Sequence, residues 1–236
     1  MTTTKAIVLS AIKYADYDLI VKCYTELGIK TFFLKRIYKS TKGKFSPSFF
    51  QLLTQLEITA NFKPNQTLHF IKEVTVHYPY TSIAQDIRKQ TIVVFLAEIL
   101  SNVLREEEAN PKLFTYVETA LQWLDTHSHT ANFHLIFLIR LSKYLGFYPQ
   151  RENEFMYFDL ENGRFTNHKL SIHTLSGEKL TQFKTLLGTN FDAIEAINFD
   201  KKIRQDLLDI LIEYFELHLH GFRRPKSLEV LKTVFN

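Results

Sequence analysis

Residues 5–38, KAIVLSAIKYADYDLIVKCYTELGIKTFFLKRIY, decide the fold of the N-terminal part of this chain. Apolar side chains recur there with a period of two, which is the spacing of β-strands. A polar break at residues 16–18 and Gly28 divide the stretch into predicted strands at 5–14, 19–25 and 29–38. Gly28 adopts the positive φ of a hairpin loop without steric cost. We therefore expect an antiparallel sheet to open the chain.

Two further strands are predicted at residues 49–62 and 68–76, after a basic loop at residues 40–48. Five short strands in about eighty residues, with one longer connection after the third, favour a small closed barrel of the OB type. A sandwich or an SH3-like barrel fits the same number of strands, and the strand count alone does not decide among the three.

Beyond residue 79 the apolar residues recur every three or four positions, as in amphipathic helices. Thr81 or Ser82 is the expected N-cap of the first helix, and Gly146 the expected end of the third. The predicted helices span about residues 83–104, 111–124, 131–145 and 201–217. Between the last two, Asn162-Gly163 predicts a β-hairpin.

The predicted fold class is α+β with more than one domain. Residues 1–79 form a five-stranded OB-type β-barrel, and residues 80–236 form an α-helical domain with a small hairpin insertion at about 150–176. The composition is that of a folded protein, since 45% of the 236 residues are apolar and only seven are Gly and six Pro. The chain has no apolar run long enough to cross a bilayer and does not open on a secretory signal. We expect a cytoplasmic protein without membrane contact.

Positive charge is concentrated near the N-terminus. The first eighty residues contain eleven Lys or Arg and five Asp or Glu, whereas the remainder contains eighteen and twenty. No acidic residue occurs between Glu26 and Glu57. This window contains Lys30, Lys35, Arg36, Lys39, Lys42 and Lys44. Such a patch is either a solvated basic face or a binding surface for a polyanion.

Enzyme signatures are scarce. The sequence has no phosphate-binding glycine loop, no dinucleotide fingerprint and no nucleophile elbow. Cys23 lies in a predicted strand, where a buried apolar role is expected. The histidines occur in pairs whose spacing does not bring three or four ligands together. We therefore predict no catalytic residue, no cofactor and no metal.

The third predicted strand favours nucleic-acid binding. Lys30, Phe32, Leu34 and Arg36 occupy one face of it, and Thr31, Phe33 and Lys35 the other. Cations interleaved with aromatic rings neutralise phosphates and stack on bases. The alternative is that Phe32 or Phe33 belongs simply to the core, and one of the two is expected there.

Several segments resemble the RecO family of recombination mediators. They are residues 5–21, the turn Glu26-Leu27-Gly28, residues 137–149 (FLIRLSKYLGFYP) and residues 221–228 (GFRRPKSL). Their order and spacing together carry the resemblance.

The resemblance implies an N-terminal OB-fold, a helical C-terminal domain and a non-enzymatic role. That role is to bind single- and double-stranded DNA, to anneal strands and to work with RecR in loading RecA onto DNA coated by single-stranded-DNA-binding protein. Many relatives also carry a four-cysteine zinc module after the Leu-Gly turn. Residues 150–179 contain no cysteine, so we expect this hairpin to lack zinc ligands and to be held by aromatic packing.

Two sets of site residues follow as hypotheses. The six cations of the acid-free window are expected to bind the phosphate backbone, with Arg223, Arg224 and Lys226 as a second DNA contact or, equally, as a C-cap cluster. The resemblance implies that the helical domain docks the acidic, aromatic-ended C-terminal tail of single-stranded-DNA-binding protein. Candidate residues for that site are Phe137, Arg140, Leu141, Lys143 and Tyr144, although a core helix would look alike. Two other functional classes remain, namely a protein-interaction adaptor whose barrel does not bind DNA and an enzyme with an unrecognised site.

Overall fold

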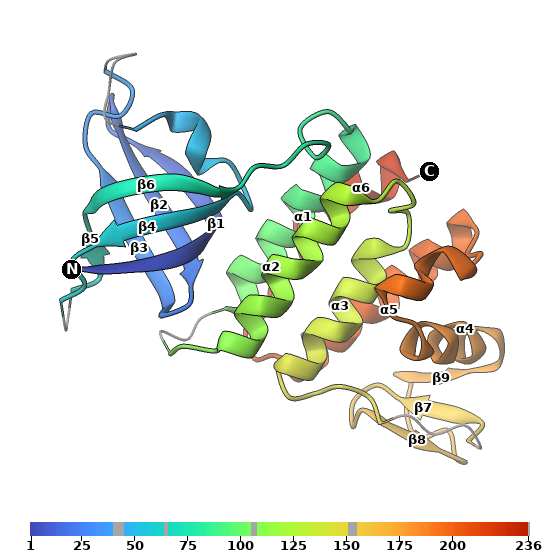
Figure 1. The fold of residues 1–236 in the computed structure, drawn as a ribbon. Coiled ribbons are helices and arrows are strands. Elements are labelled where there is room, and N and C mark those ends of the chain that lie inside the picture. Colours follow the sequence, from blue (N-terminus) through green and yellow to red (C-terminus); the bar gives the residue numbers. More distant parts are fainter. Residues whose placement is uncertain (40–44, 64–65, 105–107, 151–154, 236) are drawn as a thin grey trace. The chain divides into compact units, whose positions relative to one another are not determined.

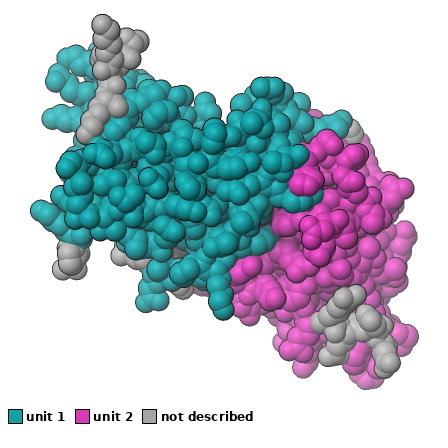
Figure 2. Space-filling view, in the orientation of Figure 1, with its two compact units in different colours: residues 1–126 teal, residues 127–236 magenta. Residues whose placement is uncertain are grey.

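A computed structural model describes residues 1–39, 45–63, 66–104, 108–150 and 155–235. The chain combines an N-terminal sheet with helices, so the α+β class is confirmed (Figure 1). It divides into two compact units, Met1–Thr126 and His127–Asn236 (Figure 2). The described residues of the first unit form the sheet and two helices. Compactness thus divides the chain at a different point from the change of secondary structure near residue 79, and the predicted domain boundary stays a prediction.

The N-terminal sheet has six strands rather than the predicted five. They are β1 (Thr2–Tyr14), β2 (Asp18–Thr25), β3 (Gly28–Leu34), β4 (Gln55–Ala60), β5 (Leu68–His69) and β6 (Ile71–Tyr78). Their order across the sheet is β5-β3-β2-β1-β4-β6. The β3–β5 pair is parallel and the other pairs are antiparallel.

The additional strand arises because the predicted strand at 68–76 is divided at Phe70. Its first part, β5, pairs with β3, and its second part, β6, pairs with β4 at the opposite edge. A register shift between Thr59 and Ala60 lies where β6 begins, and such bulges bend a strand. The hydrogen-bonded ladder is not closed, which corrects the expected closed barrel. One residue nevertheless separates the two edge strands, and this arrangement fits a partly open, OB-like sheet.

One face of this sheet forms the core of the first unit. Alternation places Val8, Val21 and Phe32 on that face with no exposed surface. The predicted strand at 49–62 begins only at Gln55, since Pro47–Phe50 form a 3-10 turn capped by Ser46. Turn and strand are joined by Leu53, which is fully buried and donates its backbone N–H to the Val8 carbonyl at 2.7 Å.

Helices α1 (Ile87–Val103) and α2 (Pro111–Thr126) complete the first unit. Asn110 caps α2, since its Oδ1 accepts the Leu113 N–H at 3.0 Å. The N-cap of α1, however, is Asp86 rather than Thr81 or Ser82. The predicted helix start was therefore too early.

A buried carboxylate explains this difference. The Asp125 side chain accepts the backbone N–H groups of Thr81, Ser82 and Ile83 at 2.8–3.1 Å, so this segment wraps around the end of α2 before α1 begins. Lys89, which is 4% exposed, donates its ammonium to Ser82 Oγ at 2.6 Å and to the Asp125 carbonyl at 2.9 Å. The backbone N–H donors stabilise the negative charge of the Asp125 carboxylate, which would otherwise be costly in a buried site.

The described residues of the second unit form four helices and a small sheet. Its helices are α3 (Phe133–Tyr144), α4 (Gly177–Gly188), α5 (Lys201–His218) and α6 (Leu228–Val234), and a 3-10 segment, η2, spans Phe191–Ala196. The sheet has the order β8-β7-β9, with β7 at Tyr157–Asp159, β8 at Arg164–Thr166 and β9 at Thr174–Ser176. The predicted hairpin is therefore present as β7–β8, and a third strand pairs with its other edge.

Aromatic packing holds this small sheet. The Phe158 ring lies 4.8 Å from that of Phe165, 5.0 Å from that of Phe183 and 6.0 Å from that of Tyr214. Within the described ranges, no group of three or more His, Cys, Asp or Glu residues is placed to hold a metal ion. A metal-free hairpin stays a prediction, which elemental analysis of the purified protein would test.

Candidate nucleic-acid interface

Strand β3 divides its side chains between core and surface. Phe32 is fully buried, so of the two neighbouring phenylalanines it is the one that serves the core. Phe33 points to the opposite face and is partly exposed, and Lys30 is half-buried on the same strand. The surface face therefore presents an aromatic ring close to the end of the strand.

Three exposed cations follow directly after β3. Lys35, Arg36 and Lys39 lie in the turn at residues 35–39, and buried Ile37 anchors this turn in the core. Arg36 has a positive φ of 58°, and its backbone N–H donates to Asp18 Oδ1 at 2.6 Å. The Lys39 N–H then bonds the Arg36 carbonyl at 3.1 Å. The turn thus gathers three positive charges on a short segment of fixed backbone.

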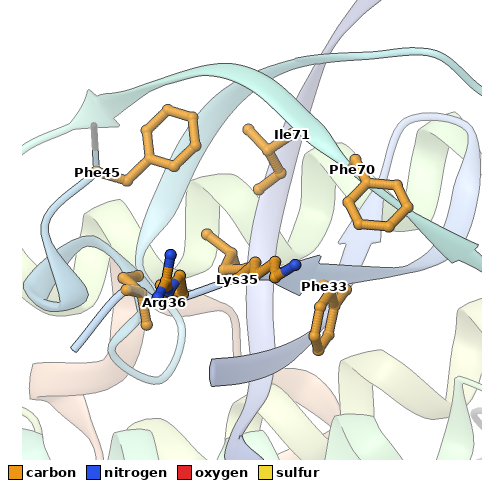
Figure 3. A pocket seen from close by; sticks show the side chains of 8 residues that line it. Phe33, Lys35, Arg36, Phe45, Phe70 and Ile71 are labelled. Atoms are coloured by element: carbon orange, nitrogen blue, oxygen red, sulfur yellow. The ribbon is translucent and has the colours of Figure 1, made fainter. Parts of the chain in front are cut away.

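A pocket of about 340 Å³ adjoins this turn. Its lining residues are Phe33, Leu34, Lys35, Arg36, Ile37, Phe45, Phe70 and Ile71. Figure 3 shows Phe45, Ile71 and Phe70 along one side, with Arg36, Lys35 and Phe33 facing them. The pocket therefore combines two cations with three aromatic rings, and its described lining contains no acidic side chain.

Aromatic rings extend this surface beyond the pocket. Phe33 meets Phe70 edge to face with ring centroids 6.0 Å apart, and Tyr14 meets Phe33 in the same manner at 6.0 Å. Phe70 is 60% exposed and Tyr14 is 55% exposed. The sequence reasoning missed Tyr14, Phe45 and Phe70 as site residues. A signal existed for Phe70, since Phe70 and Ile71 are consecutive apolar residues where strand alternation expects one polar residue.

The other predicted cations are placed differently. Lys42 and Lys44 lie outside the described residues. The predicted C-terminal cluster belongs to the second unit, where Arg223 and Lys226 are exposed. Arg224 binds Glu216 through two hydrogen bonds of 3.1 and 2.8 Å, and this contact raises the pKa of its guanidinium. Its charge is therefore partly compensated within the protein.

The predicted partner site on α3 is mostly interior. Phe137 and Leu141 have no exposed surface, so they belong to the core of the second unit. Arg140 is half-buried and donates its Nη2 to the Thr189 carbonyl at 2.9 Å. Lys143 is exposed and Tyr144 half-buried. Only the polar part of the predicted slot is therefore accessible.

The side chains of Cys23 and His134 are buried. Cys23 is buried in β2, and burial raises the pKa of its thiol, which makes it a poor nucleophile. Burial, together with the positive charge of Arg204, lowers the pKa of His134 to about 3. Among the described helices, none combines the length and apolar character that a bilayer crossing needs.

An OB-like sheet with a cationic, aromatic-lined pocket, followed by a helical unit, defines an α+β protein. Comparison with known proteins identifies its family. The family model described as Recombination protein O N terminal matches residues 1–80, and the one described as Recombination protein O C terminal matches residues 84–229.

The chain belongs to the RecO family, whose members act in DNA repair and recombination. It is 45% identical over 234 residues to the DNA repair protein RecO of Christiangramia forsetii, covering 98% of each chain. It is 46% identical over 235 residues to the protein of the same name from Flavobacterium psychrophilum, with 99% of this chain and 98% of that one covered. The Bacteroides fragilis protein of that name is 38% identical over 238 residues, with the same coverage.

Proposed function

We propose that this protein is a non-enzymatic recombination mediator that binds single- and double-stranded DNA through its N-terminal sheet. The observation that carries this proposal is the exposed cationic turn of Lys35, Arg36 and Lys39 beside an aromatic-lined pocket. Membership of the RecO family points in the same direction, because the family models are named for recombination and the relatives for DNA repair.

The cations and the aromatic rings of the proposed site have different roles in DNA binding. Lysine and arginine neutralise phosphates and release counterions, which provides affinity without regard to sequence. Aromatic rings stack on bases, and because every base has a π-face this stacking tolerates any sequence. Lys30 supports the site from β3, and Lys42 and Lys44 belong to the same basic window. The proposed site therefore binds DNA strands in general rather than one sequence.

Fluorescence anisotropy with single-stranded DNA at a series of salt concentrations tests this function. If about five phosphates are neutralised, log K should fall with log salt at a slope of about −3.5. A triple variant, Lys35→Ala with Arg36→Ala and Lys39→Ala, should bind more weakly. Its slope of log K against log salt should be less negative by about 2. An absence of binding, or wild-type affinity in the triple variant, would instead favour an adaptor whose sheet does not contact DNA.

Annealing needs a second contact for the complementary strand. Arg223, Arg224 and Lys226 of the C-terminal basic cluster are all exposed, and Arg224 shares its charge with Glu216. A double variant, Arg223→Ala with Lys226→Ala, should slow annealing of complementary oligonucleotides while the sheet still binds one strand. Unchanged annealing would assign this cluster to the C-terminal end of α5 instead.

The proposed protein partners follow from the family. They are RecR, with which the protein would load RecA, and the acidic C-terminal tail of single-stranded-DNA-binding protein. On α3 the accessible candidates for the tail are Lys143, Tyr144 and Arg140, since a cation is needed for the terminal carboxylate. Lys143→Glu should weaken binding of the tail peptide in a competition assay. If the peptide does not bind the wild-type protein, this site is wrong.

A further inference from the structure

We propose that the pocket between the end of β3 and the β5–β6 bend holds one unpaired nucleobase of a DNA strand. This inference rests on the proposed function, because it presumes that the N-terminal sheet contacts DNA. It adds that the sheet distinguishes single-stranded from duplex DNA, and that Phe70 and Phe33 are the specificity-determining residues.

The size and lining of the pocket suit a flat aromatic ligand. Its volume of about 340 Å³ lies near the lower end of the range of roughly 300–1,000 Å³ that is usual for small-ligand sites. Rings and aliphatic carbons form most of its wall, while the cations of Lys35 and Arg36 stand on one side. A base needs an apolar surface for its faces, and the phosphate attached to it needs a neighbouring cation. Both requirements are met within one cavity.

Phe70 is the residue that most strongly indicates base stacking in this pocket. It is the single residue between β5 and β6, and 60% of its surface is exposed although it is a large apolar side chain. Its ring contacts that of Phe33 at an interplanar angle of 89°, and most of the Phe70 side chain stays exposed beside this contact. Stacking of a base on that face would remove apolar surface from water without any rearrangement of the sheet.

The charges around the pocket are arranged for an anion. Asp18 is the acidic residue that contacts this turn, and its Oδ1 accepts the Arg36 backbone N–H. Oδ1 of Asp18 is thus bonded to the backbone of the turn, while Arg36 itself is exposed. In Figure 3 the Lys35 side chain extends between Arg36 and Phe33. A phosphate at the pocket rim would therefore meet two cations.

Duplex DNA cannot use the pocket in the same way. Each base of a duplex is stacked on both faces and paired along its edge, so it must leave the helix before a protein ring can stack on it. Phosphates, in contrast, are exposed in both forms. Lys35, Arg36 and Lys39 would then bind both kinds of DNA, whereas the pocket would add affinity only for the unpaired strand.

Phe70→Ala tests this division. The variant should bind a labelled oligothymidylate about tenfold more weakly, given the usual contribution of stacking on an aromatic ring, while its affinity for a duplex changes by less than about twofold. Because Phe70 is largely exposed, its truncation leaves the core intact. Phe70→Trp should retain the single-strand affinity, and Ile172→Ala, an exposed apolar residue of the second unit, is the matched control.

A fluorescent base provides an independent readout. With 2-aminopurine in the oligonucleotide, wild-type protein should quench its emission on binding, and Phe70→Ala and Phe33→Ala should reduce that quenching. If both variants keep the wild-type preference for single strands and the wild-type quenching, the pocket proposal is overturned while DNA binding by the cationic turn stands. If the wild-type protein binds neither strand nor duplex, the proposed function itself fails.

Discussion

The side chain of Asp18 holds the backbone of Arg36, with 2.6 Å between Oδ1 and the amide nitrogen. This bond joins the start of β2 to the turn after β3 and supports the positive φ of Arg36. A left-handed conformation costs a non-glycine residue roughly 1 kcal/mol or more. An acidic residue therefore shapes the cationic turn at residues 35–39.

Replacement of Asp18 should distinguish this positioning role from simple electrostatics. Asp18→Asn keeps the side-chain oxygen that accepts the Arg36 N–H and removes a negative charge, so DNA affinity should stay equal or rise. Asp18→Ala removes the same charge together with the acceptor, and we expect a severalfold lower affinity because the turn is no longer held. Anisotropy titrations measure both. Equal affinities of the two variants would contradict a positioning role for Asp18.

Removal of the Asp125 carboxylate should destabilise the first unit. Asp125 is 2% exposed and accepts three backbone N–H groups that would lose their partner. Asp125→Ala should lower the free energy of unfolding by about 3 kcal/mol in urea titrations. The matched control is Asp86→Ala, which removes the N-cap of α1 and should cost about 1 kcal/mol. Equal effects of the two changes would contradict this account.

The Asp125 carboxylate also makes the stability of the first unit depend on pH. Burial raises the pKa of Asp125, but the hydrogen bonds from Thr81, Ser82 and Ile83 outweigh it and hold the pKa below its usual value. A depressed pKa means that this stabilisation is present above about pH 3.9, the value for an unfolded chain. It is lost as the pH falls through the lower folded-state value. Wild-type protein should therefore lose more stability on acidification than Asp125→Asn.

The Tyr214 hydroxyl leaves no room for a Cβ at position 163, so Gly163 is required there. Its φ is +64°, and a Cβ at this position would lie 2.7 Å from the Tyr214 oxygen, which donates to the Phe147 carbonyl at 2.6 Å. Gly163→Ala should destabilise the second unit by about 2–3 kcal/mol. Gly146→Ala shares the positive φ but would place its Cβ in open space, so about 1 kcal/mol is expected. A smaller loss for Gly163→Ala than for Gly146→Ala in thermal unfolding would contradict the steric reason.

The ion pair of His173 with Glu213 should make the second unit less stable at alkaline pH. The two side chains meet at 2.5 Å, and this hydrogen bond, aided by the charges of Glu213 and Glu161, raises the pKa of His173. A raised pKa means that the contribution is complete below about pH 6.5, the unfolded value, and is lost as the pH rises through the folded-state value. The melting temperature should fall over this range.

Glu213→Gln provides the control for this pH dependence. It keeps a hydrogen-bonding side chain of the same size but removes the charge that favours the imidazolium. The variant should melt at a temperature that changes less between pH 6 and pH 8 than that of the wild type. An identical pH dependence in both proteins would show that other groups are responsible.

Local patterns were sufficient for much of the fold. Period-two alternation predicted β1, β2 and β3 in their order, and apolar residues every three or four positions predicted α2 and α5. Asn110 and Asp200 cap the starts of these two helices. Such signals act over a few residues, so the sequence carries them without reference to the rest of the chain. The same holds for the acid-free window, in which Lys35, Arg36 and Lys39 are exposed and Lys30 is half-buried.

Contacts between residues far apart in the sequence could not be predicted from local patterns. The Asp125 carboxylate lies more than forty residues from the Thr81–Ile83 backbone that it binds, and this contact delays the start of α1. On α3, Phe137 and Leu141 have the spacing of an exposed apolar stripe as much as that of a core stripe. Only packing against the rest of the second unit decided that they are buried.

The sequence by itself determined that the chain opens with β-hairpins, continues with helices and concentrates its cations after the third strand, because strand period, capping and charge are properties of neighbouring residues. The tertiary structure alone decided that residues 68–78 serve both edges of the sheet and that Phe70 stands exposed at the bend beside Lys35 and Arg36. These relations depend on strand pairing between residues 37 positions apart in β3 and β5 and 11 to 23 positions apart in β4 and β6. Such pairing partners are chosen by the packing of the whole sheet.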